Sequence, residues 1–207
     1  MGGIMTKTNN KGQSMSTKDL VLLSLLTALV AILAYFGGFI KIGGLASISL
    51  TLIPVVLGAA LLGPYAGAWL GGVSGAVFFM TADAAFWLGL SVFGTILTVM
   101  VKGAAAGLAA GYVYKLLEKR NKYLAIIAAA VVAPVVNTSI FLIGCILFFM
   151  DAVRDLSQGA GMGIGGFLIV GFVGLNFVFE LIVNVILSPA LARLIDIAEK
   201  KFKTLKK

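Results

Sequence analysis

The stretch GTILTVMVKGAAAGLAAGYVY, residues 94–114, carries one charged residue, Lys102, near the middle of an otherwise apolar run. A second stretch, GFLIVGFVGLNFVFELIVNVIL at 166–187, likewise carries one charge, Glu180. About 20 apolar residues cross a bilayer as a helix, and a continuous run favours a helix over the alternating pattern of a β-barrel strand. A charged side chain at the bilayer centre costs at least ~2.5–3.5 kcal/mol. We therefore expect Lys102 and Glu180 to face the interior of a helical membrane bundle.

The composition supports a membrane protein. Hydrophobic residues make up 60% of the chain and charged residues only 12%, whereas about a quarter of a soluble domain is charged. The net charge of +8 could suggest a nucleic-acid partner. The basic residues, however, flank the apolar runs, where they act as topology signals and contact anionic lipid. We expect a lipid bilayer and no nucleic acid as the surroundings of this chain.

The apolar runs predict an all-α integral membrane protein, a compact bundle of six transmembrane helices. A polar tail at 1–17 and a basic tail at 199–207 are expected to flank the membrane domain at 18–198. The second and third helices should meet at a tight Gly63–Pro64 corner, where proline opens the next helix. The helices are predicted at about 18–37, 47–62, 65–81, 93–117, 122–150 and 165–198.

The charges between the helices predict the orientation. One side of the membrane would hold Lys7, Lys11, Lys18, Lys115, Lys119, Arg120, Lys122 and the lysines of 200–207. The other side would hold Lys41, Asp83, Asp151, Arg154 and Asp155. The positive-inside rule then places both termini in the cytoplasm. The outer connections, at about 38–46, 82–92 and 151–164, are either ordinary connectors or a lid over a site that opens outward.

Several chemistries have no residues to support them. The chain has no histidine, and Cys145 is its only cysteine, which excludes a His/Cys metal site and a disulfide framework. Cys145 is expected to be a small core residue. No GxxxxGK[ST] loop occurs, so the chain does not bind ATP in the P-loop manner. We expect no cofactor and no enzymatic activity.

Small residues recur every four positions along three predicted helices. Such stripes let helix backbones approach closely in lipid. Tight packing inside the bundle is the simpler interpretation, and mobile surfaces that rock against each other are the alternative. On the first helix, the pairs Ser24/Ala28 and Thr27/Ala31 form a groove that could dock another membrane subunit. The glycine stripes are Gly63, Gly67, Gly71 and Gly75, and Gly103, Gly107 and Gly111.

Polar residues in three predicted helices fall at similar membrane depths. Asn176, Glu180 and Asn184 are spaced i, i+4, i+8 and therefore share one helix face. The rise of 1.5 Å per residue brings Lys102 and Asn137 to overlapping levels. The predicted fourth, fifth and sixth helices would thus direct these side chains at one cavity. Asparagines beside two charges suit a small ligand with carboxylate, hydroxyl and amide groups.

Other interpretations of the polar centre remain open. Lys102 and Glu180 could form a buried ion pair that only joins two helices, although such pairs often return little net stability. A proton or ion relay, as in a stand-alone ion-coupled carrier, is a second alternative. An intramembrane enzyme with the two residues as acid and base is a third, but no nucleophile, metal set or paired carboxylates accompany them.

The chain resembles the substrate-binding membrane subunits (S-components) of energy-coupling factor vitamin transporters. The resemblance covers roughly residues 18–198 and includes an LGPxxG corner at 62–67. The matching stretches are LLSLLTALVAILAYF (22–36), ISLTLIPVVLGAALLGPYAGAWLGGVSGAVFF (48–79), FGTILTVMVKGAAAGLAAGYVYKLL (93–117) and VVNTSIFLIGCILFF (135–149).

This resemblance implies a function and partners. S-components bind a water-soluble vitamin from outside through helices four to six and the outer loops. They associate with a transmembrane coupling protein and two ATPase subunits in the bacterial cell membrane, and they are thought to topple to release substrate inward. A small-residue motif on helix one contacts the coupling protein, and its counterpart here is Ser24 and Ala28, with serine in place of the usual first alanine.

The vitamin is predicted from the side chains, within a layout closest to the pantothenate/riboflavin-type branch. Lys102 suits a carboxylate, and the three asparagines suit hydroxyl and amide groups, so pantothenate is the first choice. Trp87 and Asp83, in the second outer connection, complete the expected ligand-binding set. Riboflavin or a folate-like ligand remains an alternative, because Trp87, with Phe86 and Phe93, could stack on a ring.

Overall fold

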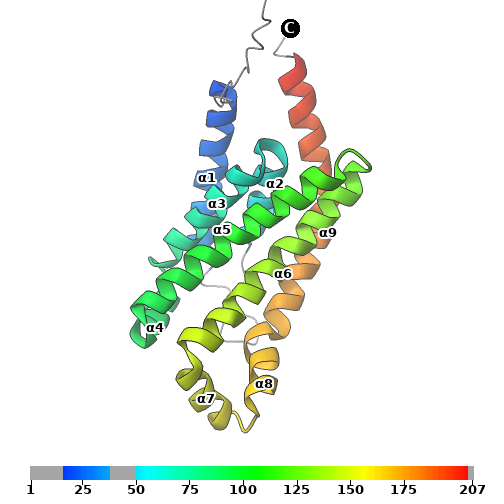
Figure 1. Ribbon diagram of the computed structural model, residues 1–207. Coiled ribbons are helices and arrows are strands. Elements are labelled where there is room, and N and C mark those ends of the chain that lie inside the picture. The colour runs from blue at the N-terminus through cyan, green and yellow to red at the C-terminus, as the bar shows by residue number, and fades with distance from the viewer. Residues whose placement is uncertain (1–15, 38–49, 205–207) are drawn as a thin grey trace, which may run out of the picture.

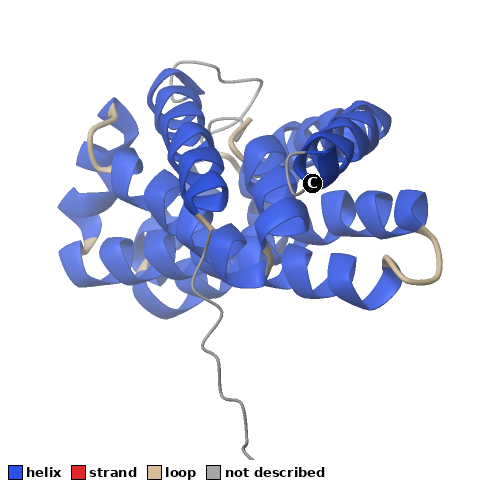
Figure 2. Ribbon diagram, turned by 90° about the horizontal axis from the view of Figure 1, so that it is seen from above, coloured by secondary structure: helices blue, strands red, loops and turns tan. Residues whose placement is uncertain are grey.

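The computed structural model describes residues 16–37 and 50–204. Within these residues, side chains at 172–173, 175–176, 194–196 and 198–204 are outside the description. Every regular element in the described part of the chain is a helix (Figure 2). The all-α prediction is therefore confirmed. The predicted outer connection at 38–46 lies outside the described residues.

The helices follow the predicted order with added segments. Three of them, α1, α5 and α6, are long and apolar enough to cross a membrane, and α3 with α4 would be a fourth span, bent by 86°. The prediction of six spans and cytoplasmic termini stays a prediction. The elements are α1 (Thr17–Gly37), α2 (Leu52–Leu62), α3 (Pro64–Phe78), α4 (Ala82–Leu90), α5 (Val92–Leu117), α6 (Lys122–Phe148), α7 (Met150–Gly159), α8 (Ile164–Phe167), the π-helix η1 (Leu168–Val173) and α9 (Gly174–Thr204).

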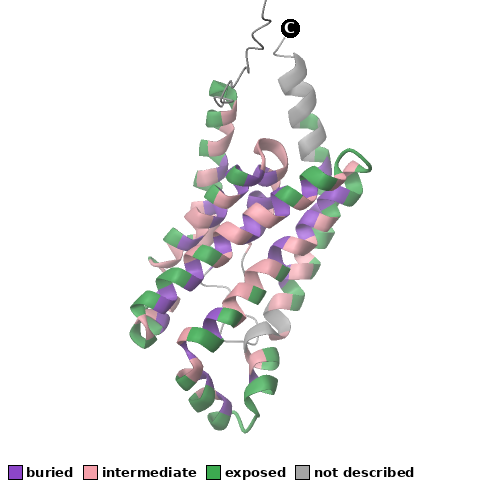
Figure 3. Ribbon diagram, in the orientation of Figure 1, coloured by how far each residue is buried: buried purple, intermediate pink, exposed green. Residues whose placement is uncertain are grey.

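Helix ends that carry basic residues lie together at one end of the molecule. Figure 1 shows the start of α1, the α5–α6 connection and the end of α9 toward one end of the molecule, and α4, α7 and α8 at the opposite end. The first end carries Lys18 and the basic run from Lys115 to Lys122. Exposed residues, green in Figure 3, concentrate on α7 and α8 and on the outward helix faces, whereas buried residues follow the faces that meet. The grouping of basic ends matches the pattern from which the orientation was predicted.

Helix α5 is the centre of the bundle and packs chiefly against α3 and α6. Its glycine stripe lies antiparallel to that of α3: Gly103 faces Gly71, and Gly107 faces Gly67. A Cβ atom at any of these four positions would overlap the backbone of the opposite helix. The two stripes therefore bring the backbones together, as close packing requires in lipid. The interpretation of the stripes as tight packing is confirmed.

Gly63 has a different role from the rest of its stripe. It lies at the corner between α2 and α3 with φ 98°, a left-handed conformation that glycine adopts without a Cβ penalty. Pro64 follows at the first turn of α3, where its missing N–H is not needed. The corner predicted from the sequence is confirmed, but Gly63 does not take part in the α3–α5 contact.

Two segments expected to be outer connections are helical. Residues 82–90 form α4, because alanine and leucine favour a helix and Asp83 suits the first turn. Residues 150–159 form α7, whose buried Val153 and Ser157 share one face at a four-residue spacing. Both segments thus form helices at the end of the bundle opposite the α5–α6 connection (Figure 1).

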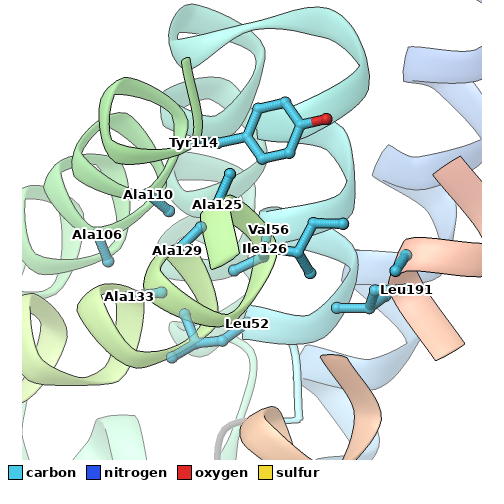
Figure 4. Packing of buried hydrophobic residues seen from close by; sticks show 11 residues of the cluster. Leu52, Val56, Ala106, Ala110, Tyr114, Ala125, Ile126, Ala129, Ala133 and Leu191 are labelled. Carbon is cyan, nitrogen blue, oxygen red and sulfur yellow. The ribbon is translucent and has the colours of Figure 1, made fainter. Parts of the chain in front are cut away.

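The largest buried cluster in the described part of the chain joins four helices. Small alanines of α5 and α6 interdigitate there with Leu52 and Val56 of α2 and Leu191 of α9 (Figure 4). Ala106, Ala110 and Ala133 are fully buried in it. Because alanine leaves room for larger neighbours, the helices pack closely here. This core packs α6 against both α5 and α9 and sets the register of the polar residues that these helices carry.

Candidate site at the centre of the bundle

Lys102 lies on α5 with its ammonium over two phenylalanine rings. Nζ is 5.0 Å from the ring centroid of Phe141 on α6 and 6.0 Å from that of Phe78 at the end of α3. A cation at these distances is attracted by the negative ring faces. Cys145, one turn after Phe141 and fully buried, is close enough to feel the charge of the lysine. The rings hold the lysine in a largely apolar environment.

The rings beside Lys102 belong to an aromatic cluster at the end of the bundle. Trp87 of α4 makes edge-to-face contacts with Phe141 at 5.4 Å and with Phe149 at 5.2 Å between ring centroids. Val153 of α7 is buried in the same cluster. Helices α4 and α7 therefore pack against the same aromatic cluster whose member Phe141 contacts Lys102. Cys145 is also part of this cluster, which confirms the prediction of a core cysteine.

The junction of α4 with α5 is anchored by hydrogen bonds. The Thr95 hydroxyl donates to the carbonyl oxygens of Trp87 and Ser91, each at 2.7 Å. The Ser91 side chain caps α5 by accepting from the Gly94 N–H at 3.1 Å. Thr95 is fully buried. These bonds fix where Trp87 sits relative to α5, and hence relative to Lys102 two turns further along.

Glu180 and Asn184 are buried on α9. Asn184 is only 1% exposed, and its Nδ2 donates to the backbone carbonyl of Glu180 at 2.8 Å. Glu180, 8% exposed, and Lys102 attract each other electrostatically. In the described part of the chain no direct ion pair joins the two residues. The charges are thus neighbours across the bundle, but each side chain has different immediate contacts.

Three buried oxygen atoms near this centre have no hydrogen-bond partner among the described residues. They are Oε1 of Glu180, Oδ1 of Asn184 and Oγ1 of Thr98. Thr98 lies one turn before Lys102 on α5, against Gly144 of α6. Buried polar atoms are nearly always paired, because burial removes their hydrogen bonds to water. Unpaired acceptors on two helices are therefore an unusual feature of this bundle.

The remaining residues of the predicted ligand set lie around this centre in different ways. Asn137 is half-buried on α6, one turn before Phe141. Asn176 lies near the start of α9, but its side chain is outside the description. Asp83 is half-buried in the first turn of α4, close in sequence to Trp87. The spacing of Asn176, Glu180 and Asn184 indeed places all three on one helix.

Sequence reasoning did not identify Phe78, Phe141 and Thr98 as part of this centre. A signal was present for Phe141, because Asn137, Phe141 and Cys145 follow each other at four-residue intervals on α6. No such signal exists for Phe78, which lies at the end of α3 and comes near Lys102 only through the α3–α5 contact. In the described residues no group of three or more His, Cys, Asp or Glu side chains could hold a metal ion.

The predicted docking residues of α1 divide between two faces. Ser24 and Ala28 are exposed, and the Ser24 hydroxyl donates to its own helix at the Leu20 carbonyl, 2.8 Å away. Thr27 and Ala31 are half-buried, and Thr27 accepts a hydrogen bond from Trp69 Nε1 of α3 at 3.2 Å. The Ser24/Ala28 pair is therefore the one presented outward.

The amino-acid sequence matches a known family of membrane proteins. A family model described as "ECF transporter, substrate-specific component" matches residues 18–192. No significant match was found among curated proteins or solved structures. The matched region contains α1 to α6, with the lysine, the aromatic cluster and the polar face of α9. An all-helical fold with long apolar helices agrees with a membrane location. The chain belongs to the family of substrate-specific components of ECF transporters.

Proposed function

We propose that this chain binds a water-soluble vitamin for an energy-coupling factor importer, and that the vitamin is pantothenate. The observation that carries the proposal is the environment of Lys102. Its ammonium lies over Phe141 and Phe78, without a direct ion pair to Glu180. A cation that rings hold in place keeps its donors available for the carboxylate of a ligand.

The neighbouring groups support a ligand with polar groups beyond its carboxylate. Glu180 and Asn184 present buried acceptors, and Asn137 lies half-buried on the adjacent α6. Pantothenate carries a carboxylate, an amide and two hydroxyl groups on a short aliphatic frame. Trp87 is only 7% exposed and is already packed against rings, which favours this aliphatic ligand over stacking on riboflavin or folate.

The energy for import would come from partner subunits. The family membership implies a coupling module, and the chain itself contains no P-loop. We infer that the Ser24/Ala28 face of α1 meets the transmembrane coupling protein, while two ATPase subunits hydrolyse ATP. Both termini would lie in the bacterial cytoplasm. A stand-alone ion-coupled carrier would instead import the vitamin in liposomes without partners and would lose uptake with an ionophore.

The direct test is ligand binding by the purified protein. Mass spectrometry of the extracted protein should detect pantothenate, and calorimetry against a panel of B vitamins should show tight binding of pantothenate. Lys102→Met should weaken that binding by at least ~10-fold, about 1.4 kcal/mol, because the carboxylate loses its cation. Lys102→Arg should retain more affinity than Lys102→Met, since it keeps the charge. Unchanged affinity in Lys102→Met, with reduced stability, would show that the lysine is structural.

A further inference from the structure

The unpaired acceptors on α9 point to the chemistry of the ligand. Oε1 of Glu180 and Oδ1 of Asn184 are buried and have no hydrogen-bond partner among the described residues. The two residues are one helical turn apart, so both side chains leave the same face of α9. Asn184 donates one Nδ2 hydrogen to the Glu180 carbonyl, whereas its Oδ1 acceptor has no partner among the described residues. Among the described residues, this face therefore presents buried acceptors without donors to pair with them.

A positively charged group is a poor partner for the unpaired acceptors of Glu180 and Asn184. Lys102 already attracts Glu180 electrostatically, and its positive charge disfavours a second cation nearby. A purely structural role is also poorly supported, since buried acceptors without partners lose their solvation and gain no bond in return. An uncharged O–H or N–H group satisfies the acceptors without placing a second positive charge beside the lysine.

We propose that Glu180 and Asn184 form an acceptor subsite that receives the hydroxyl or amide N–H groups of a ligand whose anionic group lies at Lys102. This inference rests on the proposed function and narrows the ligand class. The ligand is an organic anion that carries hydrogen-bond donors away from its acid group. Anions without donors, such as nicotinate and lipoate, satisfy only the lysine. Neutral riboflavin and cationic thiamine leave the lysine without its anion.

A matched pair of ligands tests the subsite. Pantothenate and N-(3,3-dimethylbutanoyl)-β-alanine share the carboxylate, amide and aliphatic frame, but the second compound lacks both hydroxyl groups. The single amide N–H that both compounds keep can pair with only one of the two acceptors, so the second compound leaves at least one acceptor unpaired. The site should therefore bind the second compound at least about 100-fold more weakly than pantothenate. Binding of the two compounds within about threefold of each other would overturn the subsite and leave the vitamin-binding function intact.

A wider panel separates failure of the subsite from failure of the proposed function. If biotin, an anion with ureido N–H donors, binds instead of pantothenate, the subsite is supported and the choice of pantothenate is wrong. Tightest binding of nicotinate, lipoate, riboflavin or thiamine overturns the subsite, although the chain still binds a vitamin. If no vitamin binds, the proposed function fails, and the subsite fails with it.

Asn184→Leu provides the test within the chain. Leucine has the same branching and the same number of side-chain heavy atoms as asparagine and removes the unpaired oxygen, so the unliganded protein should keep or raise its melting temperature. Affinity for pantothenate should fall at least ~10-fold, and the preference over the deoxy compound should shrink. A preference equal to that of the wild type would overturn the subsite. Ser188→Ala is the matched control. Ser188 lies one turn further on α9 and is equally buried, but its hydroxyl already donates to the Val185 carbonyl at 2.7 Å, so pantothenate affinity should stay within twofold.

Discussion

At the scale of single residues, the lysine within the apolar α5 is stabilised by aromatic faces. Phe141 and Phe78 lie 5.0 and 6.0 Å from its ammonium, and Glu180 contributes a longer-range attraction. Desolvation makes a lone buried charge costly, whereas a close ion pair would occupy the donors that a ligand needs. Ring faces stabilise the cation, and in the part of the chain that the structure describes its three donors have no carboxylate partner. Phe141 therefore acts as a positioning residue for Lys102.

Removing the Phe141 ring should loosen this arrangement. Phe141→Leu is expected to weaken ligand binding roughly 5- to 30-fold, which corresponds to a cation–π contribution of about 1–2 kcal/mol. The ammonium would then move toward Glu180, and its donors would be lost to the ligand. Phe141→Tyr keeps the ring and should remain within threefold of the wild type. Titration with the ligand, followed by tryptophan fluorescence, measures both. Equal losses in the two variants would contradict the role of the ring face.

At the scale of helices, the contact between α3 and α5 places two of the site's elements. Gly71 and Gly103 meet backbone to backbone, so α5 carries Lys102 close to the end of α3 and to Phe78. In lipid there is little hydrophobic drive between helices, and close backbone approach provides the packing energy instead. The glycine stripes therefore set the geometry of the site as well as the stability of the bundle.

A pair of neighbouring glycines tests this contact. Gly71→Ala would push a Cβ into the Gly103 carbonyl, and we expect a destabilisation of roughly 1–3 kcal/mol. Gly72→Ala is the control. A Cβ added at Gly72 would meet no atom within 4 Å, and alanine is more favourable than glycine inside a helix by about 1 kcal/mol. Thermal unfolding in detergent should therefore shift downward in the first variant and stay level or rise in the second. Similar melting temperatures of the two variants would mean that α3 and α5 can move apart at Gly71 with little loss of stability.

At the scale of the whole molecule, the outward face of α1 differs from its inward face. Thr27 accepts a hydrogen bond from Trp69 inside the molecule, whereas Ser24 and Ala28 lie among exposed apolar residues. The exposed pair lies far along the chain from the polar centre. Assembly with a coupling protein and binding of ligand can therefore be separated by substitution.

A bulky residue on α1 should separate these two properties. Ala28→Trp is expected to abolish vitamin uptake by cells that carry the coupling module, because the indole blocks close approach of the partner helix. Ligand affinity of the purified variant should be unchanged. Ile143→Trp, at a 53% exposed position on α6, is the control and should preserve uptake. Loss of ligand binding in Ala28→Trp would instead indicate that α1 supports the site.

The grouping of charged helix ends allows a test of orientation. Cys145 is the only cysteine and is buried, so a Cys145→Ser background leaves no competing thiol. In that background, Arg154→Cys on α7 should react with a membrane-impermeant maleimide added to intact cells. Lys119→Cys, at the α5–α6 connection, should react only after the cells are lysed. The opposite labelling pattern would reverse the predicted topology.

The sequence alone determined the helical class, the Gly63–Pro64 corner and the small-residue stripes. Continuous hydropathy, proline at a first helical turn and four-residue spacing are local properties, and local properties can be interpreted without a partner segment. The sequence also placed Glu180 and Asn184 on one face, for the same reason. The helices α4 and α7 were not predicted because hydropathy identifies long apolar runs. These two helices are too short to form such a run by themselves.

The tertiary structure alone decided which groups surround Lys102. The spacing of residues along the helices suggested a pairing of Lys102 with Glu180, since equal depth is all that helix geometry provides. The rings of Phe78 and Phe141 come from α3 and α6, and they reach the lysine only because glycines let α3 and α5 touch and because α6 packs on the other side. Contacts between elements depend on the rotation of each helix about its axis, which packing fixes and depth does not.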